Sequence, residues 1–227
     1  MAPTDRISTP RFRAVLFDFD GTLVDSYPAI TASINHVRAH HHLPPLAEPE
    51  VRRHVGRGPA YLLEHTVPGS EPAGDLALYR SHHPTVMRTG THLMPGVAEM
   101  MTALKEAGRA IAICSNKPGA FTRALLGHFH LTALVDAVFG PDDVARPKPA
   151  PDMVLAALAR LQVPPGRALY VGDMTVDIET ARSAGVKVWV VPTGSDARAT
   201  LAEAGPDRIL NDLREIPEEL RREEGLP

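Results

Sequence analysis

Residues 14–26 read AVLFDFDGTLVDS. A continuous apolar run, residues 14–17, leads directly into Asp18 and Asp20, and Gly21 and Thr22 follow. Such a run is typical of a strand buried on both faces, as in a parallel sheet covered by helices. Side chains two residues apart at a strand end point the same way. The sequence therefore predicts two carboxylates side by side at the end of a buried strand, where Gly21 permits a sharp turn.

The same kind of apolar run recurs further along the chain. The runs occupy residues 110–114, 137–139, 169–171 and 188–191. Helical patterns cover residues 97–104, 154–161 and 175–184. Alternating strands and helices predict an α/β fold with an open parallel sheet and right-handed crossovers. Ligands bind at the carboxyl ends of the strands in such sheets, and the polar residues of this chain follow its apolar runs.

One long segment interrupts this alternation. Between the first strand and residues 94–96 no strand-like run occurs, and the apolar residues recur at helical spacing. A structureless loop of that length is improbable in a compact domain. We therefore expect a small helical insert over residues 26–90, hereafter the cap. The predicted division is a catalytic core formed by residues 1–25 and 91–227, with the cap between them.

The pair Asp18 and Asp20 suits phosphoryl transfer. Asp18 would attack phosphorus and become an aspartyl phosphate. Asp20 would protonate the leaving oxygen and then take a proton from the hydrolytic water. The alternative is a pair of solvated turn aspartates.

A second acidic pair lies in GDMTVDIETARSAG, residues 172–185. Asp173 and Asp177 are four residues apart, so they share one face of a helix start. Together with Asp18 and the backbone carbonyl of Asp20, Asp173 would supply oxygen ligands to Mg²⁺, which binds a few carboxylates, substrate phosphate and water. For Asp177, compensation of the helix dipole competes with a role in ligating the metal or orienting a ligand.

Two further segments suit phosphate oxygens. Ser115 and Asn116 follow an apolar run, so a hydroxyl and the N–H groups of a helix start would be available there. An ordinary N-cap is the alternative. Lys148 lies between two prolines in RPKPAPD, where a fixed positive charge would pair with Asp18 and the transferring phosphoryl group. The alternative is a solvated surface lysine.

Taken together, these motifs resemble the haloacid dehalogenase-like hydrolase superfamily in its phosphatase branch. The segments DFDGTLVDS, SNKP and GPDDVARPKPAPD are most similar to those of the phosphoglycolate phosphatase-like subgroup. The resemblance implies a Rossmann-like sheet with strand order 3-2-1-4-5 and a helical cap after the first strand. It implies catalytic roles for Asp18, Asp20 and Lys148, with binding of the phosphoryl oxygens by Ser115 and Lys148. Thr22 and Asn116 are further candidates for substrate binding. It also implies magnesium held by Asp18, Asp20 and Asp173, and Asp177 occupies the second acidic position of the last motif.

The expected activity is a magnesium-dependent phosphomonoester hydrolase for a small phosphorylated metabolite, with 2-phosphoglycolate as the best single candidate. Asp20 favours phosphoryl transfer, because relatives that cleave carbon–halogen bonds typically lack it. The cap contains no lysine, which excludes a Schiff-base mechanism and weakens a phosphosugar mutase. A phosphatase for a sugar phosphate, a nucleotide or pyrophosphate stays open, as does a non-catalytic regulatory module. Met174 stands where the family often has a small hydroxyl residue.

Three further features are weaker. Arg57, in the cap segment VGRG, is a candidate contact for the organic part of the substrate; a solvated arginine in a turn is the alternative. The run His40-His41-His42 predicts a surface helix end, since consecutive histidines on a helix cannot all face one ion. Cys114 lies in a buried strand pattern and is expected to be an inert small hydrophobe.

The overall composition limits the binding partners and the cellular compartment that we expect for this chain. The 227 residues carry a formal net charge of −3, so no basic excess favours nucleic acid. A single cysteine excludes an internal disulfide and a multi-thiolate zinc site. The sequence has no signal-peptide pattern and no apolar run long enough for a membrane helix, so we expect a cytoplasmic protein with no membrane partner. A monomer or a homodimer is expected, and the sequence does not decide between them.

Overall fold

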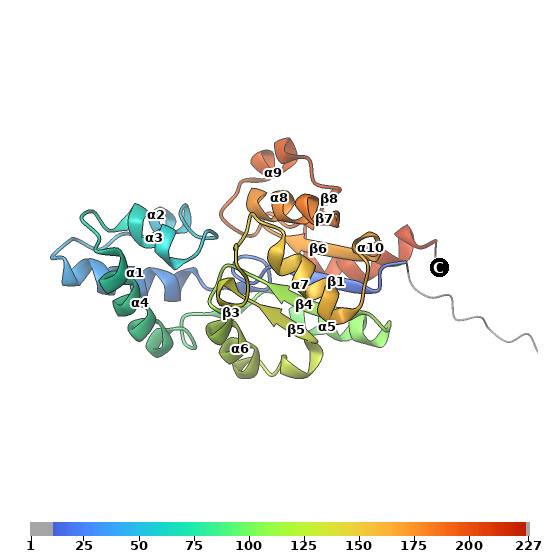
Figure 1. The fold of residues 1–227 in the computed structure, drawn as a ribbon, viewed down its shortest axis with the longest axis horizontal. Coiled ribbons are helices and arrows are strands. Elements are labelled where there is room, and N and C mark those ends of the chain that lie inside the picture. The colour runs from blue at the N-terminus through green and yellow to red at the C-terminus, as the bar shows by residue number, and fades with distance from the viewer. Residues whose placement is uncertain (1–10, 226–227) are drawn as a thin grey trace, which may run out of the picture.

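The computed structural model describes residues 11–225, and its centre is a six-stranded parallel sheet. The strands are β1 (Ala14–Phe17), β4 (Ala110–Cys114), β5 (Ala137–Phe139), β6 (Ala168–Gly172), β7 (Lys187–Val190) and β8 (Arg208–Ile209). They lie in the order β5-β4-β1-β6-β7-β8 (Figure 1). The chain therefore adds strands on one side of β1 and then on the other, and the switch point lies at β1, where ligands bind in such sheets.

The predicted α/β fold is confirmed, and one edge strand was missed. The order 3-2-1-4-5 matches β5, β4, β1, β6 and β7, and β8 extends the sheet beyond β7. Each neighbouring pair is parallel. The strand β8 has two residues, Arg208 and Ile209, and pairs only at Trp189 and Val190. So short a run carries no recognisable apolar pattern.

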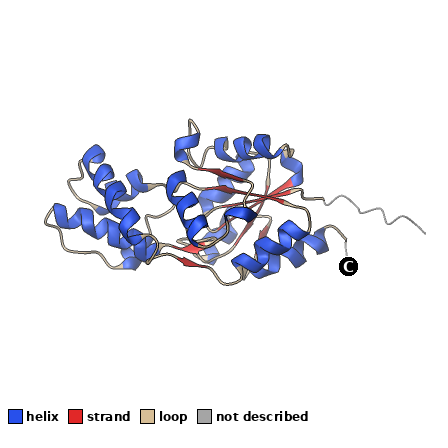
Figure 2. Ribbon diagram, turned by 90° about the horizontal axis from the view of Figure 1, so that it is seen from below, coloured by secondary structure: helices blue, strands red, loops and turns tan. Residues whose placement is uncertain are grey.

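Helices cover both faces of the sheet, as the view in Figure 2 shows. One face carries α5 (Val97–Glu106), α6 (Gly119–His128) and α10 (Ile216–Glu223), and the other carries α7 (Asp152–Leu161), α8 (Thr175–Ser183) and α9 (Arg198–Ala204). Short 3-10 helices are η1 (Thr132–Leu134), η2 (Pro141–Asp143), η3 (Pro165–Arg167) and η4 (Leu213–Glu215). Along β1, Val15 and Phe17 enter one apolar cluster and Ala14 and Leu16 the other. This alternation explains why the strand is apolar throughout.

The cap consists of four helices that pack mainly on one another. They are α1 (Tyr27–His40), α2 (Glu48–Arg52), α3 (Pro59–Thr66) and α4 (Pro72–Val86). These helices lie together on the left of Figure 1. Ile34, Val37, Leu63 and Tyr79 belong to an apolar cluster of their own. The helix α2 is only five residues long, too short for its apolar residues to show a helical period. We keep the division at residues 26–90 as a proposal.

A small antiparallel sheet joins the cap to the core. The strands β2 (Val24–Asp25) and β3 (His92–Leu93) pair with each other, just before and just after the cap. The expectation that residues between the first strand and Met94 contain no strand was therefore wrong. Two-residue strands escape a search for apolar runs, because pairing across the cap and not local pattern creates them.

No helix within residues 11–225 is long and apolar enough to cross a membrane.

Candidate active site

The register of the sheet brings the predicted site residues to one edge. Phe17, the last residue of β1, pairs with Ile113 of β4 and with Val171 of β6. The residues that follow these strands therefore emerge at the same level. Asp18 follows β1 and Asp173 follows β6, and both side chains are buried. The strand ends are thus sufficient to bring these two carboxylates together.

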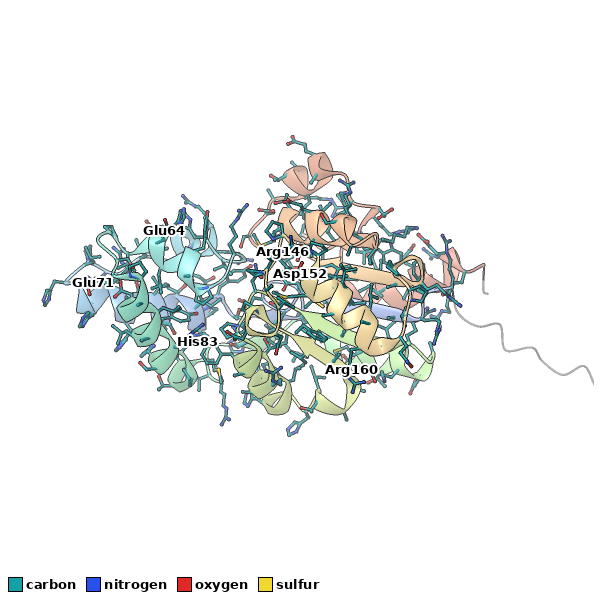
Figure 3. The ribbon with its side chains drawn as sticks, viewed as in Figure 1. Glu64, Glu71, His83, Arg146, Asp152 and Arg160 are labelled. Carbon is teal, nitrogen blue, oxygen red and sulfur yellow. The ribbon has the colours of Figure 1, made fainter. Side chains whose placement is uncertain are left out.

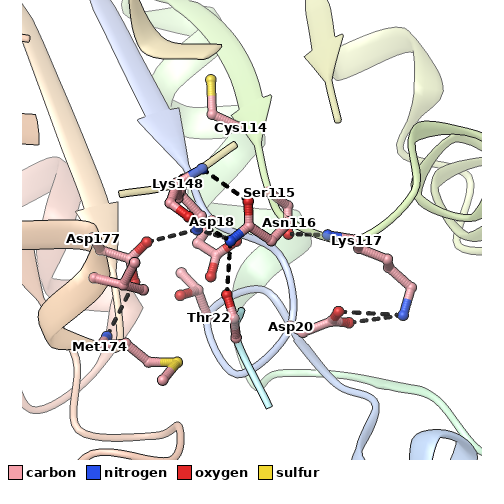
Figure 4. A network of polar contacts seen from close by, with 12 residues as sticks. Asp18, Asp20, Thr22, Cys114, Ser115, Asn116, Lys117, Lys148, Met174 and Asp177 are labelled. Atoms are coloured by element: carbon pink, nitrogen blue, oxygen red, sulfur yellow. Dashed lines mark hydrogen bonds and ion pairs between the residues drawn. The ribbon is translucent and has the colours of Figure 1, made fainter. Parts of the chain in front are cut away.

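Lys148 lies at the centre of this cluster. Its Nζ is 2.9 Å from Oδ1 of Asp18 and 2.7 Å from Oδ1 of Asp177, and it also donates to the hydroxyl of Tyr170 at 3.3 Å. Its side chain is 0% exposed, so the surface-lysine alternative does not describe it. Figure 4 shows Lys148 between Asp18 and Asp177. Burial alone would lower the pKa of Lys148, but the charges of Asp177 and Asp18 raise it above its usual range.

Asp177 uses both of its oxygens within the protein. Oδ1 accepts hydrogen bonds from Lys148 and from the hydroxyl of Tyr170 at 3.2 Å. Oδ2 accepts the N–H groups of Asp173 and Met174, each at 3.1 Å, at the start of α8. A carboxylate with this many donors holds its neighbours in place. This geometry fits both the expected role at the start of α8, whose N–H groups Asp177 accepts, and the orientation of Asp173 and Lys148.

Three carboxylates lie close enough to share a cation. Oxygens of Asp18, Asp173 and Asp177 all lie within 4.8 Å of one another. Oδ1 of Asp173 accepts the hydroxyl of Thr22 at 2.5 Å. Its other oxygen, Oδ2, is buried and has no hydrogen-bond partner within residues 11–225. A buried carboxylate oxygen without a donor is costly unless a cation faces it.

Glycines keep the space around that oxygen clear. A Cβ atom added to Gly194 would lie 1.5 Å from Oδ2 of Asp173, and one added to Gly21 would lie 2.5 Å from it. Backbone from two loops therefore approaches the carboxylate more closely than any other residue type allows. The unpartnered oxygen, the neighbouring carboxylates and the all-oxygen donor set fit a hard divalent cation such as Mg²⁺.

The carboxylates repel one another. Burial raises the pKa of Asp18 to about 6, and the charge of Asp177 adds to this rise, while Lys148 and Ser115 oppose it. Burial, followed by the charges of Asp177 and Asp18, raises the pKa of Asp173 well above its usual value. A cluster whose ionised forms are disfavoured in this way is typical of a functional site that binds a cation.

Asp20 turns away from this cluster and pairs with Lys117. The Nζ of Lys117 is 3.0 and 3.3 Å from the two carboxylate oxygens, and the hydroxyl of Ser26 donates to Oδ1 at 2.6 Å. The side chain of Lys117 is only 3% exposed. In Figure 4 this pair lies apart from the cluster around Lys148. The alternative of solvated turn aspartates therefore fits neither Asp18 nor Asp20.

Asn116 links the Lys148 loop to the cap. Its amide nitrogen donates to the carbonyls of Gly56 at 3.0 Å and Lys148 at 3.1 Å, and its Oδ1 accepts the N–H of Lys148 at 3.0 Å. Ser115 is buried beside Asp18 and also accepts the N–H of Lys117 at 3.3 Å. Asn116 thus fixes the loop that carries the central lysine, a role that the sequence analysis did not foresee.

A cavity lies between these residues and the cap. Its polar lining comes from the core: Asp18, Asp20, Ser115, Asn116 and Lys117. Its apolar lining comes from the cap residues Ile30, Val55, Leu62 and Tyr79 together with Pro118 and Phe121 of the core. Gly56, Gly58 and Pro59 complete the lining. The space that the centre of a water molecule can reach is about 40 Å³.

Three of the predicted substrate contacts, Thr22, Lys148 and Arg57, do not line this cavity. Thr22 binds Asp173 instead. Arg57 is exposed, and its guanidinium lies 5.5 Å from the centre of the Tyr61 ring, while the flanking glycines of the same loop reach the cavity. The prediction that Arg57 contacts the substrate stays a prediction, and its geometry matches the alternative of a solvated arginine in a turn.

The remaining predictions concern residues outside the cavity. The helix α1 ends at His40, as expected, and the ring of His41 lies 2.7 Å from a carboxylate oxygen of Asp75, a partner 34 positions away. Cys114 is buried, and burial raises the pKa of its thiol to about 12, in agreement with an inert residue.

Sequence reasoning missed two residues of the site. The hydroxyl of Tyr170 donates to the carbonyl of Cys114 at 2.8 Å and contacts Lys148. Because Tyr170 lies inside a buried strand, its sequence position indicated only a residue of the apolar core. Lys117 received no role of its own, although the chain has only the lysines 105, 117, 148 and 187. This scarcity was the one available signal, because a rare lysine that directly follows Ser115-Asn116 lies at the strand end where the site was expected.

Comparison with known proteins assigns the family. The family model of haloacid dehalogenase-like hydrolases matches residues 15–191. The phosphoglycolate phosphatase of Rhodospirillum rubrum is 34% identical over 215 residues, covering 90% of this chain and 89% of that protein. The N-acetylmuramic acid 6-phosphate phosphatase of Pseudomonas aeruginosa is also 34% identical, over 221 residues, covering 93% of this chain and 96% of that protein.

A solved structure agrees with these sequence relatives. The crystal structure of a predicted phosphoglycolate phosphatase from Haemophilus somnus has a TM-score of 0.84 and 27% sequence identity, and the match covers 92% of this chain and 98% of that one. The motifs and the sheet order are those expected of this family, and the matched region covers more than three quarters of the sequence. The chain belongs to the haloacid dehalogenase-like hydrolase family.

Proposed function

We propose that this chain is a magnesium-dependent phosphomonoester hydrolase that acts on a small phosphorylated metabolite, with 2-phosphoglycolate as the first candidate. The observation that carries the proposal is the position of Asp18. Its carboxylate lines the cavity, is only 3% exposed and lies 2.9 Å from the Nζ of Lys148. A buried carboxylate beside a fixed cation, open to a cavity, is the arrangement that a phosphorylated aspartate requires.

In the first step, an oxygen of Asp18 attacks phosphorus and the bond to the ester oxygen breaks. Asp20, which lines the same cavity, donates a proton to the leaving oxygen. In the second step, Asp20 takes a proton from water, which attacks phosphorus and releases phosphate from Asp18. Lys148 and Ser115 lie beside Asp18, where they can bind the phosphoryl oxygens.

Mg²⁺ would be held by Asp18 and Asp173 and by the backbone carbonyl of Asp20, with Asp177 orienting Asp173. When bound, the ion neutralises the repulsion between the carboxylates and the phosphate and polarises the phosphoryl oxygens. Thr22 supports the same arrangement, because its hydroxyl holds one oxygen of Asp173 and leaves the other for the cation.

The size of the cavity supports a small substrate. Space of about 40 Å³ for water centres corresponds to a few water molecules. The relatives named phosphoglycolate phosphatase point the same way. A sugar phosphate is the second candidate, because one relative of equal identity is named for N-acetylmuramic acid 6-phosphate. That ligand would require the cap residues around Val55 and Leu62 to move away from the core.

The test is phosphate release from a panel of phosphomonoesters, with Mg²⁺ and with a chelator. We expect turnover only with the metal and the highest kcat/KM for a two- or three-carbon phosphate ester. If the sugar phosphates are preferred, the proposed substrate is wrong, whereas the proposed phosphatase chemistry still holds. Interconversion of phosphorylated sugars without phosphate release would instead indicate a mutase.

The nucleophile is tested by Asp18→Asn. We expect turnover to fall by roughly 10⁴-fold or more, since the covalent step is lost. Rapid quenching of the wild-type protein with a ³²P-labelled ester should trap label on Asp18. Circular dichroism of the variant provides the control for folding. Retained catalysis in Asp18→Asn, with no label trapped in the wild type, would refute the assignment.

A further inference from the structure

Beyond the phosphoryl site, the cavity must hold the organic part of the substrate. Of the described residues that line it, Lys117 alone carries a positive charge. The cap contributes uncharged residues: the apolar side chains of the lining, Tyr79, and the segment residues Gly56, Gly58 and Pro59. Lys148 is not in the lining and is already bound by two carboxylates. An anionic group on the leaving part of a substrate therefore has one side chain in the cavity to pair with.

A second basic side chain near Lys117, that of His83, is neutral. His83 lies on α4, where the cap helices face the core (Figure 3), and its ring is 5.1 Å from that of Phe121. Burial, together with the charge of Lys117, lowers the pKa of His83 to about 3. Its Nδ1 lies 3.0 Å from the hydroxyl of Ser33. At neutral pH, His83 thus adds no second positive charge beside Lys117.

The ammonium of Lys117 also lies close to the group that would protonate the leaving oxygen. It lies 3.0 Å from Oδ1 of Asp20, the residue proposed to protonate the leaving oxygen. In 2-phosphoglycolate the carboxylate carbon is two bonds from that oxygen, so a substrate whose leaving oxygen meets Asp20 brings its carboxylate within reach of Lys117. A lysine side chain is flexible and can exchange one partner for another.

We propose that Lys117 recognises the carboxylate of the substrate and so selects small phosphate esters that carry an acid group next to the ester oxygen. This inference rests on the proposed phosphatase function. In the free protein the ammonium pairs with Asp20. In the complex it pairs with the substrate carboxylate, while the hydroxyl of Ser26 keeps its hydrogen bond to Asp20. Lys117 is thus a specificity-determining residue.

The test compares 2-phosphoglycolate with 2-hydroxyethyl phosphate, in which an uncharged hydroxymethyl group replaces the carboxylate. Their kcat/KM ratio is measured in the wild type, Lys117→Gln, Lys117→Arg and the matched control Lys105→Gln. Lys105 is also paired with a carboxylate, that of Asp136, but it lies on the surface of α5. A charge-assisted hydrogen bond contributes about 1.5–3 kcal/mol, or roughly 10–150-fold.

We expect the wild type to prefer 2-phosphoglycolate and Lys117→Gln to lose that preference by 10-fold or more. Lys117→Arg should restore part of it, and Lys105→Gln should keep it. An equal loss on both substrates would mean that Lys117 acts only through Asp20, and this would overturn the proposal. So would a wild-type protein that does not discriminate between the two esters.

Binding provides a second readout where turnover of Lys117→Gln is too low to measure. The inactive Asp18→Asn protein is titrated calorimetrically with both esters, with and without the added Lys117→Gln change. Selective weakening of 2-phosphoglycolate supports the proposal, and equal weakening of both overturns it. Failure of the proposed function has a different signature, because then no ester of the panel is hydrolysed even by the wild type.

Discussion

Two buried lysine–aspartate pairs lie within this site, and they differ in how they are held. Lys148 is fully buried between Asp18 and Asp177 and also contacts the hydroxyl of Tyr170. Lys117 has one carboxylate partner, Asp20, and its pair lines the cavity (Figure 4). A lysine with several fixed partners keeps one position, whereas a lysine with one partner can change it.

The difference separates two tasks. The Lys148 pair is buried at the carboxyl ends of the strands, where Lys148 holds Asp18, the proposed nucleophile, and offsets the charge of the neighbouring carboxylates. The Lys117 pair faces the cap, where substrates differ from one another. We therefore expect Asp18 and Lys148 of the first pair and Asp20 of the second to serve the phosphoryl chemistry, and Lys117 to decide the choice of substrate.

After Asp18→Asn, the largest expected effect in this comparison comes from Asp20→Asn. We expect kcat to fall by roughly 10²–10⁴ for alkyl phosphates, the usual contribution of a positioned proton donor. The loss should be smaller for p-nitrophenyl phosphate, whose leaving group needs little protonation. Steady-state kinetics on both esters measures the contrast, with the exposed Asp142→Asn as the control. Full activity on an alkyl phosphate would rule out Asp20 as the acid.

Next comes Lys148→Gln. We expect kcat to fall by roughly 10²–10³, since a fixed charge beside the phosphoryl group is lost. The fold should also lose about 3–5 kcal/mol, because Asp18 and Asp177 are left buried without a counter-charge. Chemical denaturation measures this loss, and Lys187→Gln, a partly exposed lysine paired with Glu223, is the control. Adding Asp177→Asn should recover part of the stability; no recovery would contradict the ion-pair explanation.

A smaller effect concerns pH and the metal. The folded-state pKa of Asp18 is raised from 3.8 to about 6, so between these values the folded protein binds a proton that the unfolded chain has released. The free energy of unfolding of the metal-free protein therefore falls as pH rises through this window. The raised pKa of Asp173 acts in the same direction.

Thermal unfolding in EDTA, at pH values from about 4 to 7.5, tests this sign. The midpoint changes by about 2–4 °C for each kcal/mol in a chain of this size. Asp173→Asn should raise the midpoint at neutral pH in EDTA, and Mg²⁺ should raise that of the wild type but not that of the variant. A variant less stable than the wild type in EDTA would show that the hydrogen bonds of Asp173 stabilise the metal-free protein more than repulsion among the carboxylates destabilises it.

The smallest effect is expected for Arg57→Ala. The side chain is exposed and lies over Tyr61, outside the cavity, so kcat/KM should stay within about 2-fold for every ester. Arg52→Ala is the informative comparison. Arg52 donates from the cap to the carbonyl of Thr193 in the core at 2.7 Å, so we expect its removal to raise KM. A loss of kcat/KM in Arg57→Ala that is confined to 2-phosphoglycolate would show that Arg57 contacts this substrate.

Most of the core could be predicted because its signals are local. Runs such as residues 14–17 and 110–114 are apolar throughout, and each ends at a polar residue. Parallel strands bring their carboxyl ends to one edge, so Asp18 and Asp173 could be expected together without knowledge of side-chain packing. The strands β2, β3 and β8 could not be found in this way, because each has two residues and exists only through its partner.

By itself, the sequence determined the α/β alternation, the helical insert and the acidic residues at the strand ends, because periodicity and strand-end position are properties of neighbouring residues. The pairing of Lys148 with Asp18 was predicted from the sequence and is present in the structure, but only the tertiary structure decided that Lys148 also meets Asp177 and that Lys117 meets Asp20. Lys117 and Asp20 are 97 positions apart, and Lys148 and Asp177 are 29 apart. A flexible side chain points where burial and charge allow, and both depend on residues that pack there from distant parts of the chain.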